Sequence, residues 1–132
     1  MLKTFATICI IGMFTSSCTS KKASRTEGSH EAEQDLTMIV GTYTSGDSKG
    51  LYSFRFNEEN GTATALSEAE VENPSYLVPS ADGKFIYAVS EFSNEQAAAN
   101  AFAFNKEEGT FRLLNTQKTG GEDPCYIITN GS

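Results

Sequence analysis

The sequence predicts an all-β protein built from a repeated antiparallel sheet, and two observations carry this prediction. Short runs of alternating, aromatic or β-branched residues are separated by turns rich in Asn, Asp and Gly, and no segment of useful length has the 3.6-residue period of a helix. The order of these runs also recurs along the chain at a nearly constant separation.

The individual strands follow from their local patterns. The run at 51–56 alternates between two faces, and the run at 85–91 is rich in aromatic and β-branched residues. The segment 96–100 has helical propensity, but it is short and lies between strands, so we expect a loop there. The expected strands are 38–43, 51–56, 63–70, 75–79, 85–91, 100–105, 111–117 and 125–129.

Residues 48 positions apart match along the middle of this region. The identities fall on strand aromatics and on a turn glycine, so chance is a poor explanation. The matched pairs are Phe54/Phe102, Phe56/Phe104, Asn57/Asn105, Glu59/Glu107, Gly61/Gly109, Thr62/Thr110 and Leu66/Leu114, and Pro74-Ser-Tyr76 matches Pro124-Cys-Tyr126 after a two-residue insertion. A four-stranded unit recurring at this period is typical of β-propeller blades.

The phase of the repeat predicts which strands belong to which blade. If 75–79 is an inner strand, then 85–91, 100–105 and 111–117 follow it outward, and the strands before 75 form a blade that lacks its inner strand. Closed propellers often supply such a strand from the C-terminus. The run at 125–129 would be the inner strand of a further blade. Because a blade cannot bury both faces alone, the sequence calls for more blades than it contains.

The N-terminus has the order of a secretory signal peptide. Lys3 precedes an apolar run at 5–14 that is too short to span a bilayer, and small polar residues follow it. We therefore expect a signal peptide at 1–17 and export to the cell envelope, in the periplasm or at the outer membrane. A buried N-terminal helix is the competing interpretation.

Cys18 directly follows two serines, and this arrangement resembles a bacterial lipobox, although Thr15 stands where that pattern prefers Leu. The resemblance implies acylation of Cys18 and a lipid anchor in the membrane. The alternative is cleavage to a free secreted chain. Residues 18–35 are nearly devoid of apolar side chains, so we expect a flexible linker between the anchor and the domain at 36–132.

Composition limits the possible partners and cofactors. The formal net charge is −7, which argues against a nucleic-acid partner because phosphates need Lys and Arg. The single histidine, His30, lies in the linker, and Cys125 is the one cysteine expected in the folded part. One His and one Cys cannot build a zinc site, so we expect no metal and no cofactor.

Several blocks of the chain together resemble the lactonase family, the bacterial 6-phosphogluconolactonase-like seven-bladed propellers. The resemblance runs from about Met38 to the last residue and covers the N-terminal portion of such a protein. Its blocks are VGTYT at 40–44, GLY at 50–52, NPSY at 73–76, DGKFIYAV at 82–89 with Glu91, LNTQ at 114–117, GG at 120–121 and DPC at 123–125. The fold implied is a partial propeller, with about two four-stranded antiparallel blades of an expected seven.

The resemblance implies an enzyme that hydrolyses a sugar lactone, 6-phosphogluconolactone being the usual substrate of the family, and related propellers are lactone cycloisomerases. Attack of water on a ring ester needs a base for the water and a donor for the oxyanion. The catalytic residues are unknown, because the family's His- and Arg-rich motifs belong to later blades. Two other interpretations stay open: a non-catalytic envelope binding module, or a truncated and inactive product.

Three residues are candidates for the lining of the substrate pocket. Glu91 ends an expected strand and could point towards the central channel, Tyr43 holds the matching place one blade earlier, and Tyr126 stands where the family often has His. The competing interpretation is that Tyr43 packs and Glu91 bonds a neighbouring loop. Arg55 and Arg112 are expected to be solvated.

Overall fold

The computed structural model describes residues 36–131. The signal peptide, the lipidated Cys18 and the linker expected from the sequence lie outside these residues. Over the part that is described, no helix is long and apolar enough to cross a membrane.

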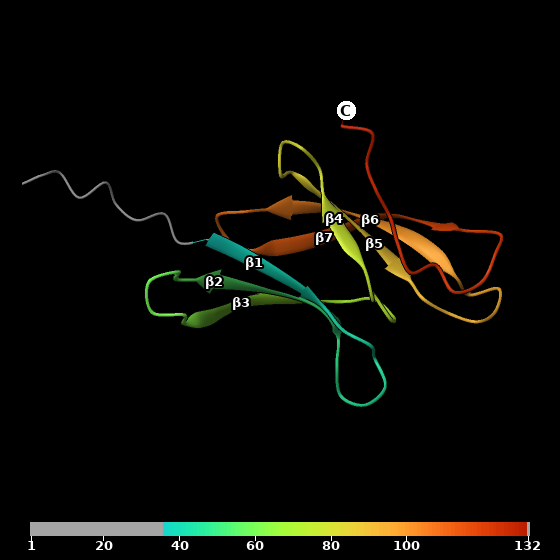
Figure 1. The fold of residues 1–132 in the computed structure, drawn as a ribbon, viewed down its shortest axis with the longest axis horizontal. Helices are drawn as coiled ribbons and strands as arrows, with labels where there is room; N and C mark the ends of the chain where they lie inside the picture. The colour runs from blue at the N-terminus through green and yellow to red at the C-terminus, as the bar shows by residue number, and fades with distance from the viewer. Residues whose placement is uncertain (1–35, 132) are drawn as a thin grey trace, which may run out of the picture. The chain divides into compact units, whose positions relative to one another are not determined.

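The described chain forms two antiparallel sheets that follow one another along the sequence (Figure 1). We call the three-stranded sheet blade 1 and the four-stranded sheet blade 2. Blade 1 consists of β1 (Leu36–Gly41), β2 (Gly50–Phe56) and β3 (Ala63–Glu70), and blade 2 consists of β4 (Leu77–Pro79), β5 (Phe85–Ser90), β6 (Ala98–Asn105) and β7 (Thr110–Lys118). Within each sheet, every strand pairs with the strand that follows it in the sequence. The predicted all-β class and the division into an incomplete and a complete blade are confirmed.

The repeat extends to details of the hydrogen-bond ladders. A β-bulge falls between Ser53 and Phe54 in blade 1, and its counterpart 48 residues later falls between Ala101 and Phe102 in blade 2. A bulge adds local twist to a sheet. The two blades therefore share their twist as well as their strand order.

The backbone just after the outer strand is also held in the same way in both blades. The amide of Val71 donates to the carbonyl of Lys49 at 3.0 Å, and 48 residues later the amide of Thr119 donates to the carbonyl of Ala97 at 3.1 Å. These bonds hold the end of each outer strand beside the start of the strand next to it.

Several predicted strand boundaries were wrong by one or two residues, and two of these differences matter for the candidate site and for the loop expected at 96–100. β1 ends at Gly41, so Tyr43 lies in the following loop rather than in the strand. β6 begins at Ala98, inside the segment expected to be a loop. There Ala98 and Ala99 pair with Ser90 and Val89 of β5, and this pairing overrides their weak β propensity.

The predicted inner strand at 125–129 is also wrong, because no strand forms between Gly121 and Gly131. In Figure 1 the chain runs on beyond β7 as a plain coil. The inner strand β4 pairs only with the strand that follows it. By the same rule 125–129 would pair with a strand that follows it, and the described residues contain no such strand. An extended segment without a ladder partner is not a strand.

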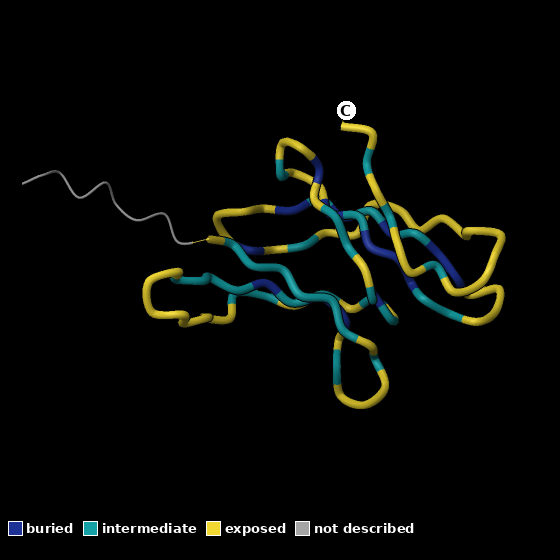
Figure 2. The backbone as a smooth tube through the Cα atoms, in the orientation of Figure 1, coloured by how far each residue is buried: buried dark blue, intermediate teal, exposed yellow. Residues whose placement is uncertain are grey.

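The hydrophobic core lies between the two blades. Leu51 of blade 1 is fully buried against residues of β5 and β6 in blade 2, and Ile39, Ala69, Val71, Leu77 and Phe111 pack around this cluster. The blade 2 members are Ile86, Ala88, Phe102 and Phe104. Figure 2 shows the buried stretches on the strands and the exposed ones mainly on the connecting loops and the C-terminal segment.

The two arginines differ in environment. Arg112 is exposed, as predicted. The prediction for Arg55 was wrong: it is half-buried and donates from Nη2 to the carbonyl of Glu107 in blade 2 at 2.7 Å. The alternating pattern places Arg55 on the same face as the buried Leu51, which is the face that blade 2 covers.

We predict that Phe102→Ala costs about 3–5 kcal/mol of the free energy of unfolding, because it empties a fully buried site. Its repeat counterpart Phe54 is only half-buried, so Phe54→Ala should cost clearly less. Urea unfolding followed by circular dichroism measures both changes. Equal losses would contradict a core centred between the blades.

Candidate functional site

The loops that follow β1, β3, β5 and β7 carry all three pocket residues suggested by the sequence. These loops span 42–49, 71–76, 91–97 and 119–126. Hydrogen bonds join the first three of them across the two blades, as described below. These loops lie on the side of the two sheets where the inner strand β4 begins. Polar side chains of both blades meet there.

Tyr43 and Glu91 form the centre of the candidate site. The phenol of Tyr43 donates to Oε2 of Glu91 at 3.0 Å, although the two residues are 48 positions apart on different blades. The hydroxyl of Ser75 donates to the same carboxylate oxygen. The 48-residue repeat places Tyr43 and Glu91 at matching positions of the two blades, and the structure joins their side chains directly.

The contact changes the acidity of the phenol. The pKa of Tyr43 is raised above its ordinary value, chiefly because the carboxylate of Glu91 accepts the phenolic hydrogen bond and so favours the protonated form, with smaller contributions from desolvation and from the negative charge of Glu91. The side chain is more than half exposed, at 56%. Tyr43 therefore stays a hydrogen-bond donor at neutral and mildly alkaline pH while it remains open to a ligand.

Asn73 fixes the backbone beneath this cluster. Its carbonyl accepts the amides of Ser75 at 2.8 Å and Glu91 at 3.0 Å, and its side-chain amide donates to the carbonyl of Glu91 at 3.2 Å. Its Oδ1 accepts from the amide and the hydroxyl of Thr44 at 3.1 and 3.0 Å. The φ of +46° lies in the left-handed region that Asn tolerates. Asn73 thus ties the loops that carry Tyr43 and Glu91 into one frame.

The same arrangement recurs one blade later with a different side chain. Asp123 has a φ of +50°, its amide donates to the carbonyl of Phe92 at 2.9 Å, and its Oδ1 accepts from the hydroxyl of Ser93 at 2.6 Å. The repeat therefore places a left-handed Asn before Pro74 and a left-handed Asp before Pro124.

Tyr126, the third candidate residue, contacts Tyr76 rather than the carboxylate of Glu91. Its ring is 60% exposed and packs against the ring of Tyr76, with centroids 4.9 Å apart and planes tilted by 50°. Exposed tyrosine rings of this kind offer apolar faces with a polar tip to a ligand. Cys125 lies near enough to add a small contribution of its own to the raised pKa of Tyr43.

Sequence reasoning missed Ser75 and Asn73 as members of the site. Both belong to the NPSY block that served only to identify the repeat and the resemblance. The available signal was the repeat itself, because Asn73 and Ser75 align with Asp123 and Cys125 beside two identical residues. No group of three or more His, Cys, Asp or Glu side chains in the described part could hold a metal ion.

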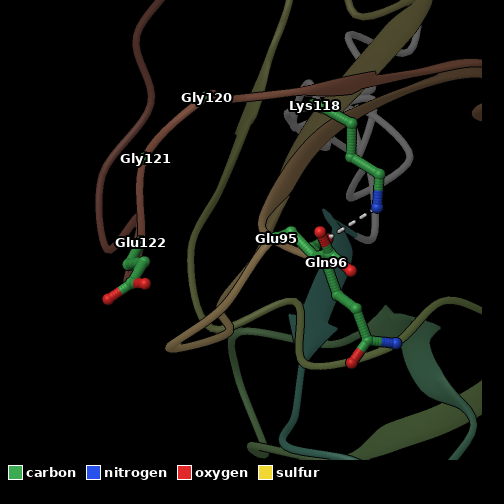
Figure 3. Close-up of a pocket in the computed structure, with 6 residues that line it drawn as sticks. All are labelled: Glu95, Gln96, Lys118, Gly120, Gly121 and Glu122. Atoms are coloured by element: carbon green, nitrogen blue, oxygen red, sulfur yellow. Dashed lines mark hydrogen bonds between the residues drawn. The ribbon is translucent and has the colours of Figure 1, made fainter.

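A pocket lies in blade 2 between the segment before β6 and the segment after β7 (Figure 3). It is bordered by Glu95 and Gln96 before β6, by Lys118 at the end of β7, and by residues 120–122 after that strand. The ammonium of Lys118 donates to the carbonyl of Gln96 at 3.4 Å, while Glu122 stands apart on the glycine loop. It shares no lining residue with the Tyr43–Glu91 cluster, and none of the candidate site residues predicted from the sequence lines it.

We predict that Glu91→Gln lowers the pKa of Tyr43 towards the ordinary tyrosine value, because an amide lacks the charge that holds the phenolic proton. The measurement is the alkaline titration of tyrosine absorbance, and subtraction of the Tyr43→Phe curve isolates this phenol. Glu95→Gln, in the same loop, is the matched control and should leave the curve in place. An unchanged Tyr43 titration in Glu91→Gln would contradict the contact.

Comparisons with known proteins agree with the fold and the repeat. Residues 37–132 match the family described as Lactonase, 7-bladed beta-propeller. A curated 6-phosphogluconolactonase from Bacillus subtilis (strain 168) is 35% identical over 92 residues, which are 67% of this chain and 25% of that protein.

Solved structures give the same picture. A candidate 6-phosphogluconolactonase from Bacteroides fragilis NCTC 9343 is 68% identical over 76% of this chain and 28% of its own, with a TM-score of 0.74. The periplasmic gluconolactonase PpgL of Pseudomonas aeruginosa is 27% identical over 67% of this chain and 26% of its own, with a TM-score of 0.62. The chain thus spans about a quarter of the length of these relatives, and it belongs to the lactonase family of seven-bladed β-propellers.

Proposed function

We propose that the protein hydrolyses a sugar lactone as a closed propeller to which this chain contributes blades 1 and 2. Support comes from membership of the lactonase family and from relatives described as 6-phosphogluconolactonases and as a gluconolactonase. The observation that carries the proposal is the contact of Tyr43 with Glu91 across the two blades. It places a carboxylate and a phenol donor together at the edge where the inner strands begin.

The reaction requires a base and a hydrogen-bond donor. The oxygen of water attacks the carbonyl carbon of the lactone while a base takes the water proton, and a donor stabilises the oxyanion that forms. The bond from the carbonyl carbon to the ring oxygen then breaks, and the ring oxygen takes up a proton. The product is the open-chain sugar acid.

Glu91 and Tyr43 suit these two roles. Among the described residues, the hydroxyls of Tyr43 and Ser75 both donate to Oε2 of Glu91, so Oε1 is the oxygen that takes the proton from water. Tyr43 keeps its own proton because its pKa is raised, and its exposed hydroxyl can turn towards a substrate oxygen. A phosphate on the substrate would need Arg or Lys, and the charge of Glu91 would repel it, so the polyol part of the substrate faces this side.

The test uses a chimeric propeller in which residues 37–132 of this chain replace the matching segment of the Bacteroides fragilis relative. We call this chimera the ring. Glu91→Gln should lower kcat by about 10²-fold or more, because the amide cannot take a proton. Assays use glucono-δ-lactone and 6-phosphogluconolactone. The 132-residue chain alone should not exceed the uncatalysed rate.

Glu95→Gln again serves as the control and should keep the full rate. A Glu91→Gln ring as active as its parent would remove Glu91 from the mechanism. A parent ring inactive on both lactones, or rapid turnover by the 132-residue chain alone, would contradict the proposed function.

We also propose that the protein is exported and anchored in the cell envelope through acylated Cys18. The apolar run at 5–14, the two serines before Cys18 and the polar linker at 18–35 support this. An envelope location also agrees with the periplasmic relative from Pseudomonas aeruginosa. It would give the enzyme sugar lactones that arise outside the cytoplasm.

Labelling of bacterial cells with an alkynyl palmitate analogue tests the anchor. We predict that the protein is labelled and that Cys18→Ala abolishes the label, because the acyl chains attach at that residue. Cys9→Ala and Cys125→Ala control for other thiols and should remain labelled. Labelling that survives Cys18→Ala would overturn the anchor.

A further inference from the structure

A further pocket lies between the two blades, next to the one in Figure 3. One wall is the end of β3 with the residues just after it, and the other is formed by β5, β6, β7 and the loop 91–97. We call it the interblade pocket. Its volume of about 340 Å³ falls within the range of about 300–1,000 Å³ that is usual for ligand sites. Both of its walls belong to blades 1 and 2.

The floor of the interblade pocket is a row of hydrogen-bonded polar side chains on blade 2. The hydroxyl of Thr116 donates to Oδ1 of Asn100 at 2.8 Å, and Nδ2 of Asn100 donates to Oγ of Ser90 at 2.9 Å and to the carbonyl of Ala88 at 3.3 Å. Asn100 and Ser90 are only 4% and 6% exposed. Asn100 stands on the same face of β6 as Phe102, which packs in the apolar core. A polar row on this face costs desolvation that apolar side chains would avoid.

The row keeps hydrogen-bonding capacity on the side of the pocket. Oγ of Ser90 accepts from Asn100, so the hydroxyl keeps its own hydrogen, and no acceptor for this hydrogen is found among the described residues. Oγ1 of Thr116 donates to Asn100, which leaves its lone pairs able to accept. The floor therefore offers both a donor and acceptors, which suits a ligand whose groups both donate and accept, as alcohol hydroxyls do.

The repeat shows how blade 1 fills the corresponding space. Tyr52 stands 48 residues before Asn100. Its hydroxyl accepts from the amide of Lys49 at 2.7 Å and donates to Oγ of Ser48 at 3.3 Å, so the phenol closes the gap to the loop 42–49. In blade 2 the shorter Asn100 bonds to β5 instead, and both Asn100 and Gln96, the counterpart of Ser48, line the pocket. The interblade pocket thus corresponds to the place of a six-membered ring with a hydroxyl group.

The upper part of the pocket combines an aromatic side chain with balanced charges. Phe92 is half-buried in its wall, and Glu70, Glu72 and Lys118 stand at its exposed rim. The carboxylate of Glu70 is paired with the ammonium of Lys49 at 2.8 Å. The charges of Glu72 and Lys118 also cancel, so the rim has no net charge. This balance favours a neutral ligand over an anion such as a phosphate, which would need an excess of Lys or Arg.

We propose that the interblade pocket binds a neutral pyranose sugar, either as a free monosaccharide or as the end of a glycan. A pyranose is a six-membered ring with an apolar face of C–H groups and a rim of hydroxyls. Its apolar face would lie against the ring of Phe92, and its hydroxyls would bond to the row formed by Thr116, Asn100 and Ser90.

The surroundings of the pocket also leave room for a longer ligand. Gln96 and Lys118 line both the interblade pocket and the pocket in Figure 3, so further units of a glycan have a place to lie. Neither Tyr43 nor Glu91 lines the interblade pocket. The sugar site is therefore separate from the proposed site of hydrolysis, and it does not depend on that reaction.

Isothermal titration calorimetry with methyl α-glycosides of glucose, galactose and mannose tests the pocket, in the ring and in the 132-residue chain. At least one glycoside should bind saturably. Thr116→Val keeps the shape of the side chain but removes its hydroxyl, so it should weaken binding about 3–10-fold. Asn100→Tyr should abolish binding, because its ring fills the pocket as Tyr52 does in blade 1. Circular dichroism checks that each variant is folded.

Two control variants separate this site from the rest of the chain. Thr110→Val lies on the same strand but outside the pocket, and Tyr43→Phe alters the candidate site for hydrolysis. Both should keep the affinity of the parent. The absence of saturable binding for all three glycosides would overturn the proposal. Binding that survives Thr116→Val and Asn100→Tyr but is lost in Tyr43→Phe would also overturn it.

Trisaccharides that end in the preferred sugar distinguish the two sources of the ligand. Tighter binding of the trisaccharide than of the methyl glycoside would support the end of a glycan, and equal affinity would support a free sugar. In both cases Asn100→Tyr should abolish binding of the trisaccharide. Trisaccharide binding that Asn100→Tyr leaves intact would contradict the assignment of the sugar to the interblade pocket.

Discussion

The packing of blade 2 on blade 1 is the constraint on which the rest of the structure depends. Each sheet is only one layer thick, so it has no core of its own, and its apolar side chains are buried only where another sheet covers them. Here a cluster around Leu51 and Phe102 supplies the apolar contact. Hydroxyl and guanidinium donors to the Gly109 turn supply the polar contact beside it. Both are needed, because buried carbonyls without partners would offset part of the gain from apolar burial.

The candidate site is a product of the same junction. Tyr43 comes from blade 1 and Glu91 from blade 2, so their 3.0 Å contact exists only when the blades are in register. Asn73 lies in the segment that joins the blades and bonds to the loops on both sides. The geometry of the carboxylate and the phenol is therefore set by backbone that belongs to neither blade alone, which allows the loops to change chemistry without disturbing the sheets.

The sequence predicted the strands and the blade division well, because both follow from local patterns and from a repeat that marks equivalent positions. The predictions from the sequence were wrong where the structure of a segment depends on a neighbouring strand or blade. The run at 125–129 has the composition of a strand, but no strand among the described residues pairs with it. Arg55 is polar, but it faces the neighbouring blade. At the site, the repeat placed Tyr43 and Glu91 at matching positions. Their contact and the role of Ser75 depend on how close the loops lie in space. The period of a sequence repeat gives no information about that distance.

The contact between the turn at Gly109 and blade 1 has a consequence for the order in which the described chain folds. Ser53 donates to the carbonyl of Gly109 across 56 positions of the sequence, whereas every strand pair joins strands that are neighbours in sequence within one sheet. The junction between the blades therefore carries the larger cost in loop entropy, and we expect it to form after the strand pairs of each sheet.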